Sequence, residues 1–451
     1  MEEKSKAVAA AETKEAFNDY EFSPVPEEKK NTWKAQVFVW LGVGFCLTAF
    51  TLGGQIALGL GFWPTVAAVL IGGIILTVVG CLVGAIGVRS GLSSTVSSRF
   101  TFGTYGAIIF GIINALCNFG WFGYQCTFFG SSITSMFKLA AGIDVNLTAC
   151  IVIGGLLMMI TAIVGYKGIK TLSQFGVPLL FLLVIAGVIK TFTIVPAGEV
   201  FSAAPVVPIS FASAVSLMVG SFIVGVSIVQ DFTRYSKTVK DSSIGIVLGF
   251  TIGYPAVVIC GAIFACAFQS NDLTNTLINV LGFGYIAAFI IVVATWTTND
   301  NNLYQSVLGL TNACHGIIKL PRWITTAICG IIATILGAIG MIDWLVPFLN
   351  ILSVVVPPIT GAMLADFYIL KNADSYKFEL MDKIPNVRPD TSIGAIAGCL
   401  VGFCMNEPPI GFGVPFMVQL STVIPTALVA MACSVVVVLI VNKLTRKEAA
   451  R

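Results

Sequence analysis

The sequence predicts an all-α polytopic membrane protein, and three observations support that fold class. Of the 451 residues, 57% are hydrophobic and only 10% are charged, whereas soluble domains carry about 25% charged residues. Twelve apolar runs follow one another along the chain, and most approach the roughly 20 residues that a helix needs to cross a bilayer. The positive charges alternate between the connections of these runs, as the positive-inside rule requires.

The apolar runs define the expected spans and the organisation of the chain. Residues 1–34 form a charged and polar tail without an apolar stretch, so they are not a signal peptide. A cytoplasmic loop is expected at 371–391 and a cytoplasmic tail at 442–451. The eleventh span is expected to be short or irregular. The twelve expected spans are 36–57, 63–88, 104–128, 147–166, 174–195, 210–232, 244–268, 277–310, 323–342, 346–370, 392–403 and 416–441.

The placement of the cations fixes the expected orientation. With both termini inside, the tails and inner connections hold 23 of the 25 Lys and Arg residues. Only Lys138 and Lys190 fall on the outer side. Because a miscounted helix would scramble this alternation, we expect twelve spans, both termini cytoplasmic, in the inner (plasma) membrane.

Two expected helices, five spans apart, are interrupted by glycine. Paired helices of this kind in two halves of a chain point to a transport site at the membrane midplane. The halves would be 36–195 and 206–370, inserted with opposite topology and followed by two further helices at 392–441. Close helix packing is the alternative explanation for each glycine. The interrupting residues are Gly42, Gly44, Gly53 and Gly54 in the first span, Gly220 and Gly225 around Ser221-Phe222 in the sixth, and Pro357-Pro358 as a bend or gate in the tenth.

Several function classes are excluded. Twelve cysteines are scattered without a CxxC pair, and His315 is the only histidine, which argues against a metal centre or a catalytic triad. No phosphate-binding loop precedes a Lys-Ser/Thr pair, which argues against an ATP-driven pump. A channel would need a continuous polar stripe or charged ring. We therefore expect no enzyme, no cofactor beyond a coupling ion, and no nucleic-acid partner.

The eighth span contains a dense polar stretch, Thr-Trp-Thr-Thr-Asn-Asp-Asn-Asn-Leu-Tyr at 295–304. Unsatisfied polar groups at membrane depth cost several kcal/mol each, on the order of a lost hydrogen bond or more, so such a cluster indicates function. The alternative is that these groups only join helices. We expect Asp300 and Asn299 to have a structural or gating role within the bundle.

Neutral oxygens in this region suit a hard cation such as sodium. Thr297 and Thr298 offer hydroxyls, and Ala294, one turn earlier, offers a carbonyl. An unwound first helix around Gly42 to Phe45 would add two carbonyls. A proton-coupled protein would use a titratable carboxylate instead, and Asp300 is the candidate within a span.

The third span offers a face suited to a flat polar ring. Asn114, Asn118, Trp121 and Gln125 are spaced 4, 3 and 4 apart and share one side of a helix. An indole can stack on a heterocycle while an amide reads its polar edge. Phe222, after Ser221 at the presumed break of the sixth helix, would be the second aromatic of a sandwich. Ordinary core packing is the alternative for both rings.

Several motifs resemble those of bacterial cytosine permeases in the nucleobase–cation symporter family. The most specific is Trp-Thr-Thr-Asn-Asp-Asn-x-Leu-Tyr at 296–304, and the resemblance runs in order from about residue 36 to the end. The others are Leu-Gly at 41–42, Arg-Ser-Gly-Leu-Ser-Ser at 89–94, Arg-Phe-Thr-Phe-Gly at 99–103, Gly-Trp-Phe-Gly at 120–123, Val-Gly-Ser-Phe-Ile at 219–223, Asp-Phe-Thr-Arg-Tyr at 231–235, and Pro-Pro-Ile-Thr-Gly with Ala-Asp-Phe at 357–367.

The resemblance implies a leucine-transporter-like fold, a 5+5 inverted repeat plus two helices, and sodium-coupled uptake of a nucleobase. It places sodium among the oxygens of Gly42, Phe45, Ala294, Thr297 and Thr298. It also places the base between Trp121 and Phe222, with Ser221 and the helix-six backbone on its polar edge.

This sequence departs from the family pattern at two positions. Asn118 stands where the family has Gln, and Val224 where it has Ser. A site that pairs a polar edge discriminates strongly by that pairing. Cytosine, a purine, a uracil-like base, an allantoin-like ring and hydroxymethylpyrimidine therefore all stay open as substrates.

From these observations we expect a monomeric sodium-coupled symporter in the lipid bilayer that imports a nucleobase by alternating access. A proton-coupled symporter for a nucleobase or related heterocycle, using Asp300, is the alternative.

Overall fold

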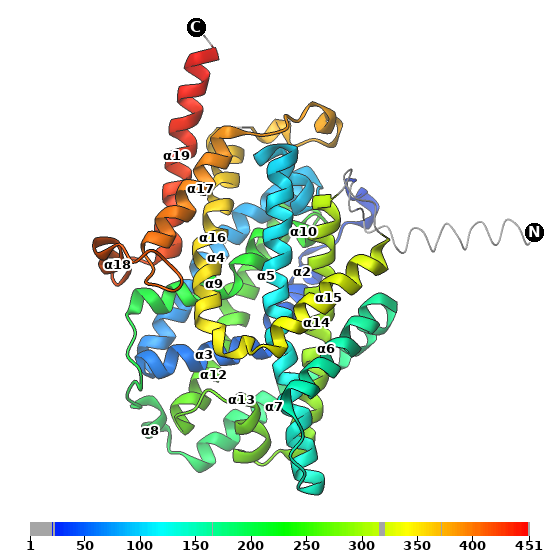
Figure 1. Ribbon diagram of the computed structural model, residues 1–451, viewed down its shortest axis with the longest axis vertical. Coiled ribbons are helices and arrows are strands. Elements are labelled where there is room, and N and C mark those ends of the chain that lie inside the picture. The colour runs from blue at the N-terminus through cyan, green and yellow to red at the C-terminus, as the bar shows by residue number, and fades with distance from the viewer. Residues whose placement is uncertain (1–19, 21–22, 165, 315–320, 371, 450–451) are drawn as a thin grey trace, which may run out of the picture.

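The protein is helical, with no β-strand among the residues that the structure describes. The computed structural model describes Tyr20 and residues 23–164, 166–314, 321–370 and 372–449. Most of the expected tail at 1–34, the single histidine His315 and the last two residues of the expected tail at 442–451 lie outside the described residues. In Figure 1 the long helix α5 (Ser94–Ala141) runs through the middle of the bundle, and α19 (Thr426–Ala449) projects from it at the C-terminal end.

Within the described ranges, six helices are long and apolar enough to cross a membrane, and one bent pair makes a seventh. The six are α4 (Phe62–Ser90), α5, Gly176–Ile194 within α7 (Tyr166–Ile194), the continuous run Val239–Phe268, the run Leu345–Ile369, and Thr426–Thr445 within α19. The other expected spans overlap α6 (Leu147–Val164), α9 (Phe211–Ser227), α14 (Gly284–Cys314), α15 (Arg322–Ala338) and α17 (Pro389–Cys404). The expected bounds differ at 277–310, because α14 begins only at Gly284, and at 416–441, because α19 begins only at Thr426. Shorter elements connect them: η1 (Glu27–Lys29), α8 (Ala197–Phe201), α10 (Gln230–Thr233), α13 (Leu273–Asn275), η3 (Thr276–Val280), η4 (Met341–Trp344), η6 (Ala373–Ser375), η7 (Phe378–Lys383) and α18 (Pro415–Ser421).

The first span is broken, as its glycines predict. It consists of α2 (Trp33–Gly44) and α3 (Leu47–Leu60), whose axes differ by 58°. Phe45, the residue after α2, has φ −89° and ψ 74°, which is outside the helical region. The chain therefore turns at Phe45 and Cys46 and then resumes a helix.

Both halves of this broken span pack on one partner, the run of α11 (Val239–Val247), the π-helix η2 (Leu248–Gly253) and α12 (Tyr254–Phe268). Gly245, Gly249 and Gly253 recur every four residues along its α2-facing side. A Cβ atom at Gly249 would lie 2.6 Å from Cβ of Trp40, and one at Gly245 would lie 2.6 Å from Cβ of Gln36. Small residues at this spacing let two helix backbones approach closely.

The sixth span has no helix break at Ser221-Phe222, where the sequence predicted one. Helix α9 runs without interruption through Ser221 and Phe222, and the break follows Ser227, before α10 begins at Gln230. Gly220 serves packing instead: a Cβ atom there would lie 2.5 Å from the carbonyl oxygen of Leu349 on α16 (Leu345–Leu364). The prediction that freed backbone groups of Ser221-Phe222 bind ligand is therefore wrong, because those groups remain in the helix.

Pro357 and Pro358 do not interrupt the tenth span either, although a bend was expected there. Helix α16 includes both prolines and ends seven residues later in the π-turn η5 (Ala365–Ile369). Neighbouring helices enclose this segment: the Ser434 hydroxyl of α19 donates to the Pro358 carbonyl at 2.7 Å, and Gly398 of α17 lies against the Pro358 ring. Proline within a membrane helix is tolerated where neighbouring helices surround it in this way.

Helix α5 bends sharply near its start, at Gly103. Gly103 has φ 81°, a conformation that L side chains rarely adopt, and a Cβ atom there would lie 2.8 Å from the Pro385 carbonyl. The loop before α17 fills the bend, since the amides of Thr104 and Tyr105 donate to the carbonyls of Pro385 and Asn386. The connection between the tenth and eleventh spans is therefore fastened to the third.

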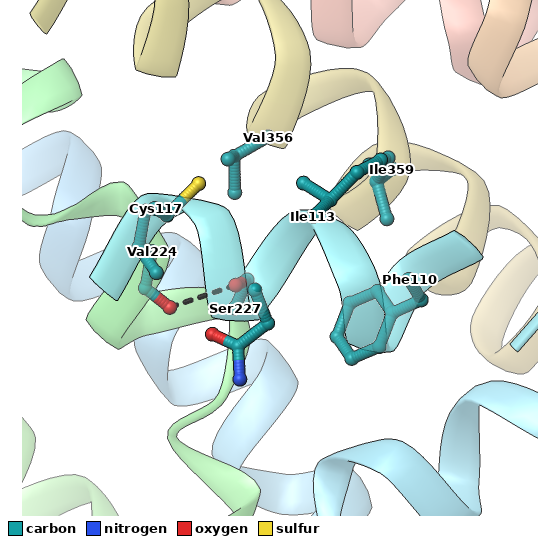
Figure 2. Close-up of a pocket in the computed structure, with 8 residues that line it drawn as sticks. Phe110, Ile113, Cys117, Val224, Ser227, Val356 and Ile359 are labelled. Carbon is teal, nitrogen blue, oxygen red and sulfur yellow. Dashed lines mark hydrogen bonds between the residues drawn. The ribbon is translucent and has the colours of Figure 1, made fainter. Parts of the chain in front are cut away.

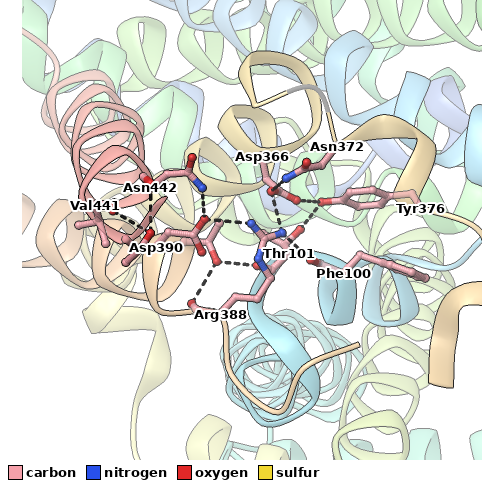
Figure 3. Close-up of polar contacts among 11 residues, drawn as sticks. Phe100, Thr101, Asp366, Asn372, Tyr376, Arg388, Asp390, Val441 and Asn442 are labelled. Carbon is pink, nitrogen blue, oxygen red and sulfur yellow. Dashed lines mark hydrogen bonds and ion pairs between the residues drawn. The ribbon is translucent and has the colours of Figure 1, made fainter. Parts of the chain in front are cut away.

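A polar network holds this connection in place (Figure 3). Asp366, at the end of the tenth span, pairs with Arg388 at 2.7 Å and accepts a hydrogen bond from the Tyr376 hydroxyl at 2.6 Å. Arg388 also pairs with Asp390 at 3.0 Å and donates to the Phe100 carbonyl of α5 at 2.9 Å. Burial and the adjacent Asp366 carboxylate raise the pKa of the Tyr376 phenol above its ordinary range. Burial alone would lower the pKa of Arg388, but the two carboxylates outweigh it and hold that pKa above its usual value.

Replacing Asp366 with Asn is expected to destabilise the protein by about 3 kcal/mol, because Arg388 would lose one buried carboxylate while keeping Asp390. Thermal unfolding of the purified protein measures this as a lower Tm. The matched control is Asp144→Asn, which breaks the exposed Lys138–Asp144 pair and should change stability by about 1 kcal/mol at most. Equal Tm values for the two variants would contradict the structural role of the network.

Candidate functional site

Three of the five oxygens predicted to bind a cation lie together on α14. The hydroxyls of Thr297 and Thr298 both donate to the carbonyl of Ala294, at 3.0 and 2.9 Å. Because each hydroxyl acts as the donor in these bonds, its oxygen keeps lone pairs for a ligand. A group of neutral oxygens suits a hard monovalent cation.

The other two oxygens lie at the break of the first span, where the bend releases them from the helix. In a regular helix the Gly42 carbonyl would accept from the amide of Cys46, and the Phe45 carbonyl from the amide of Ala49. Instead, the Cys46 amide donates to Gly44 at 3.1 Å, and the Ala49 amide donates to Cys46 at 3.1 Å. The carbonyls of Gly42 and Phe45 are therefore left without their usual helical donors.

Helix α7 borders both parts of this oxygen set. A Cβ atom at Gly176 of α7 would lie 3.7 Å from the Thr297 methyl group. The Phe45 ring packs on the Phe181 ring of the same helix, with centroids 5.3 Å apart. No cluster of three His, Cys, Asp or Glu side chains occurs in the described part of the chain.

The face of α5 predicted to read a ring is buried in the bundle, and its aromatic member packs against the tenth span. The Trp121 ring meets the Phe348 ring edge-on at 5.2 Å. Phe222 instead packs on Phe250 at 4.8 Å and Tyr254 at 4.9 Å. The two aromatics of the expected sandwich thus belong to different aromatic groups, and the sandwich stays a prediction.

The polar groups beside these rings present hydrogen-bond acceptors. The Asn118 amide nitrogen donates to the backbone and side-chain oxygens of Asn114, at 2.8 and 3.0 Å, so Asn118 is left with its carbonyl oxygen. Oε1 of Gln125 is buried without a hydrogen-bond partner. Ser221 donates to the Met218 carbonyl at 2.7 Å. A ligand rich in N–H groups would complement this set.

A small pocket lies between α5, α9 and α16, one turn along α5 from Asn118 (Figure 2). Val224, the position where the family has serine, lines it, and so does Ser227, whose hydroxyl donates to the Val224 carbonyl at 2.7 Å. Its walls are otherwise mostly apolar. The lining residues are Phe110, Ile113, Asn114, Cys117, Val224, Ser227, Val356 and Ile359.

The side chains of Asp300 and Asn299 both contact neighbouring helices. Asp300 is 2% exposed, and its Oδ1 lies 3.3 Å from the Thr161 hydroxyl of α6, which also accepts from the Trp296 indole at 2.9 Å. Asn299 is fully buried and donates to the Phe122 carbonyl of α5 at 3.0 Å. This geometry favours the structural role that the sequence suggested for the pair.

The sequence missed one residue that belongs to this region, Tyr254. Its ring contacts Phe222 and its hydroxyl lies 2.8 Å from the Ser221 hydroxyl. Only the glycine spacing of the preceding residues, Gly245, Gly249 and Gly253, could have pointed to this helix as a close neighbour of the first span.

Comparison with known proteins identifies the chain's relatives. Residues 24–424 match the family described as permeases for cytosine/purines, uracil, thiamine and allantoin. The cytosine permease of Escherichia coli (strain K12) is 30% identical over 353 residues, which is 78% of this chain and 81% of that protein. The hydantoin permease of Microbacterium maritypicum is 24% identical over 369 residues, 74% of this chain and 72% of that protein.

Solved structures of the same fold include two membrane transporters. The inward-facing conformation of Mhp1 superimposes with a TM-score of 0.77 at 18% identity and covers 93% of both chains. A Na+-coupled sialic acid symporter in an outward-open, substrate-bound state gives a TM-score of 0.60 at 12% identity, covering 92% of this chain and 90% of that one. At these identities the likeness concerns the fold alone.

Replacing Asn299 with Leu is expected to remove the hydrogen bond from α14 to the Phe122 carbonyl and lower stability by about 1–3 kcal/mol, because a buried acceptor loses its donor. Thermal unfolding measures the loss. Asn301→Leu, at a half-buried position two residues along the same helix, is the control and should change Tm much less. An unchanged Tm in Asn299→Leu would show that this contact does not hold the helices together.

Proposed function

Because the chain belongs to the family of permeases for cytosine and purines, uracil, thiamine and allantoin, we propose that it is a sodium-coupled symporter that imports a nucleobase or a related heterocycle. It is a transporter and not an enzyme. In this proposal twelve spans form a 5+5 inverted repeat followed by two helices. The monomer lies in the inner membrane with both termini in the cytoplasm.

The observation that carries the proposal is two groups of neutral oxygens, one at the break of the first span and one on α14, both of which lie against α7. The bend at Phe45 frees the carbonyls of Gly42 and Phe45, while Thr297 and Thr298 gather around the Ala294 carbonyl. A freed carbonyl inside a membrane is costly unless something satisfies it, by several kcal/mol on an order-of-magnitude scale. Sodium would satisfy these groups and stabilise the bend.

The acceptor-rich polar groups support a heterocycle that carries N–H donors. Asn118 and Ser221 use their own donors within the protein, and the buried Oε1 of Gln125 has no partner. The names of the relatives fit this chemistry, since cytosine, hydantoin and allantoin all present N–H groups. The ring itself would lie between Trp121 and Phe222, with Val224 beside it.

In the transport cycle, sodium would bind first and hold α2 and α3 in the arrangement that completes the heterocycle site. Each ligand must then raise the affinity of the other by the same factor, because linkage between two binding sites is reciprocal. Alternating access would follow from movement of the bundle around this site.

Thermal stabilisation of the purified protein by a panel of nucleobases and related rings, each with sodium and with choline, tests the proposal. A ligand that binds only the folded protein stabilises it by mass action, by about 2.7 kcal/mol at a hundredfold excess over Kd. A shift for one heterocycle that grows with sodium is the expected result. A shift indifferent to sodium would contradict sodium coupling, and no shift with any ring would contradict the substrate class.

Thr298→Ala is expected to weaken sodium binding about tenfold, because one of five ligands is lost, while heterocycle binding at saturating sodium changes little. The sodium concentration that half-saturates the heterocycle-induced Tm shift measures the effect. Thr295→Ala is the control, since Thr295 lies on the same helix and makes a similar bond, to the Ile291 carbonyl, but is not one of the five predicted ligands. Similar sodium curves for the two variants would argue against Thr298 as a ligand.

Asp300→Asn decides between the two coupling ions. If Asp300 is structural, the amide keeps a polar contact with Thr161, and uptake into proteoliposomes retains its sodium dependence and pH profile. Loss of transport together with a changed pH optimum would instead favour proton coupling through this carboxylate.

A further inference from the structure

Tyr254 touches both parts of the proposed site from a third helix. It is the first residue of α12, it follows the π-helix η2, and it is 3% exposed. Its ring packs on Phe222, and its hydroxyl lies 2.8 Å from that of Ser221. On its other side, a Cβ atom at Gly44 would lie 3.5 Å from the Tyr254 Cβ. Gly44 stands between Gly42 and Phe45, the two carbonyls freed by the bend.

The direction of the Tyr254–Ser221 hydrogen bond follows from counting protons. A serine hydroxyl has one proton, and Ser221 donates it to the Met218 carbonyl at 2.7 Å, since a carbonyl can only accept. Tyr254 must therefore be the donor to Ser221. The Ser221 oxygen is left with one lone pair for a ligand, so it presents an acceptor and not a donor.

We propose that Tyr254 is a positioning residue that couples the broken first helix to the heterocycle site through Ser221. The proposal rests on the proposed function, which supplies the two sites that it connects. The Tyr254 hydroxyl donates to Ser221 and so keeps the Ser221 oxygen available as an acceptor. Because Tyr254 contacts both Gly44 and Phe222, a movement of Gly44 would move the Phe222 ring. The ligand atom that faces Ser221 is then an N–H donor, such as an exocyclic amine or a ring amide N–H, and not a carbonyl.

The segment before Tyr254 packs closely against the first half of the broken span. Gly249 and Gly253 lie in η2 and bring its backbone against Trp40 and Leu41 of α2. A π-turn inserts an extra residue into a helix and is common at functional sites. If α2 shifts when sodium binds, η2 would therefore shift with it, and Tyr254 directly follows η2.

The test is Tyr254→Phe, which keeps the ring packing and removes only the hydroxyl. Binding of the heterocycle found in the panel is measured on the purified protein over a range of sodium concentrations. We expect affinity at saturating sodium to fall about threefold to tenfold, the size of one buried hydrogen bond. We also expect the sodium-induced gain in affinity to fall to about twofold or less. Tyr368→Phe is the control, because its hydroxyl donates to the Leu82 carbonyl away from the site.

The variant Ser221→Ala tests whether Tyr254 acts by positioning Ser221 or by a general effect on the structure. If Tyr254 acts through Ser221, the double variant binds no more weakly than Ser221→Ala alone, whereas independent effects would multiply. Ser221→Ala should also lose the sodium-induced gain and the preference for an amino over an oxo ring. A full sodium gain in Ser221→Ala, or in a folded Tyr254→Phe, overturns the proposal while the transporter function stands. Wild-type protein that binds no heterocycle would overturn both.

Discussion

The broken first span imposes the constraint on which the rest of the structure depends. A backbone carbonyl in the membrane interior must be satisfied, because no water is present to replace a lost helical hydrogen bond. At Phe45 the chain gives up two such bonds and redirects the neighbouring amides to Gly44 and Cys46. The oxygens that remain are the ones to which we assign the proposed sodium ion, because neutral oxygens suit that cation.

A bend of this kind has to be supported by its neighbours. The run from α11 to α12 provides that support with glycines on the α2 side and with Gly261, which lies against the Phe50 carbonyl of α3. The same run carries Tyr254 to Ser221. The cation set and the heterocycle set, which lie on different helices, are thus joined by one element that packs against the bend.

The connection between the tenth and eleventh spans is held rigidly. Arg388 is paired with two carboxylates, and the loop backbone fills the bend at Gly103. In Figure 3 these contacts join the beginning of α5, η5, α17 and α19. A buried network whose members are paired favours a single local arrangement, so these segments are held to one another at this end of the bundle.

The sequence by itself determined the membrane class, the positions of most helices and the break in the first of them, and it predicted which residues would form the cation set. These follow from local properties: apolar length, cation placement, and hydroxyl and glycine spacing along one helix. It did not determine whether Gly220 breaks α9 or packs it, whether Pro357 and Pro358 bend α16, or that Tyr254 reaches Ser221. Each of those depends on a neighbour distant in the chain, Leu349 for Gly220, Ser434 for Pro358 and α9 for Tyr254. Only the tertiary structure could decide them, because a glycine or proline has the same local preference whether or not another helix lies against it.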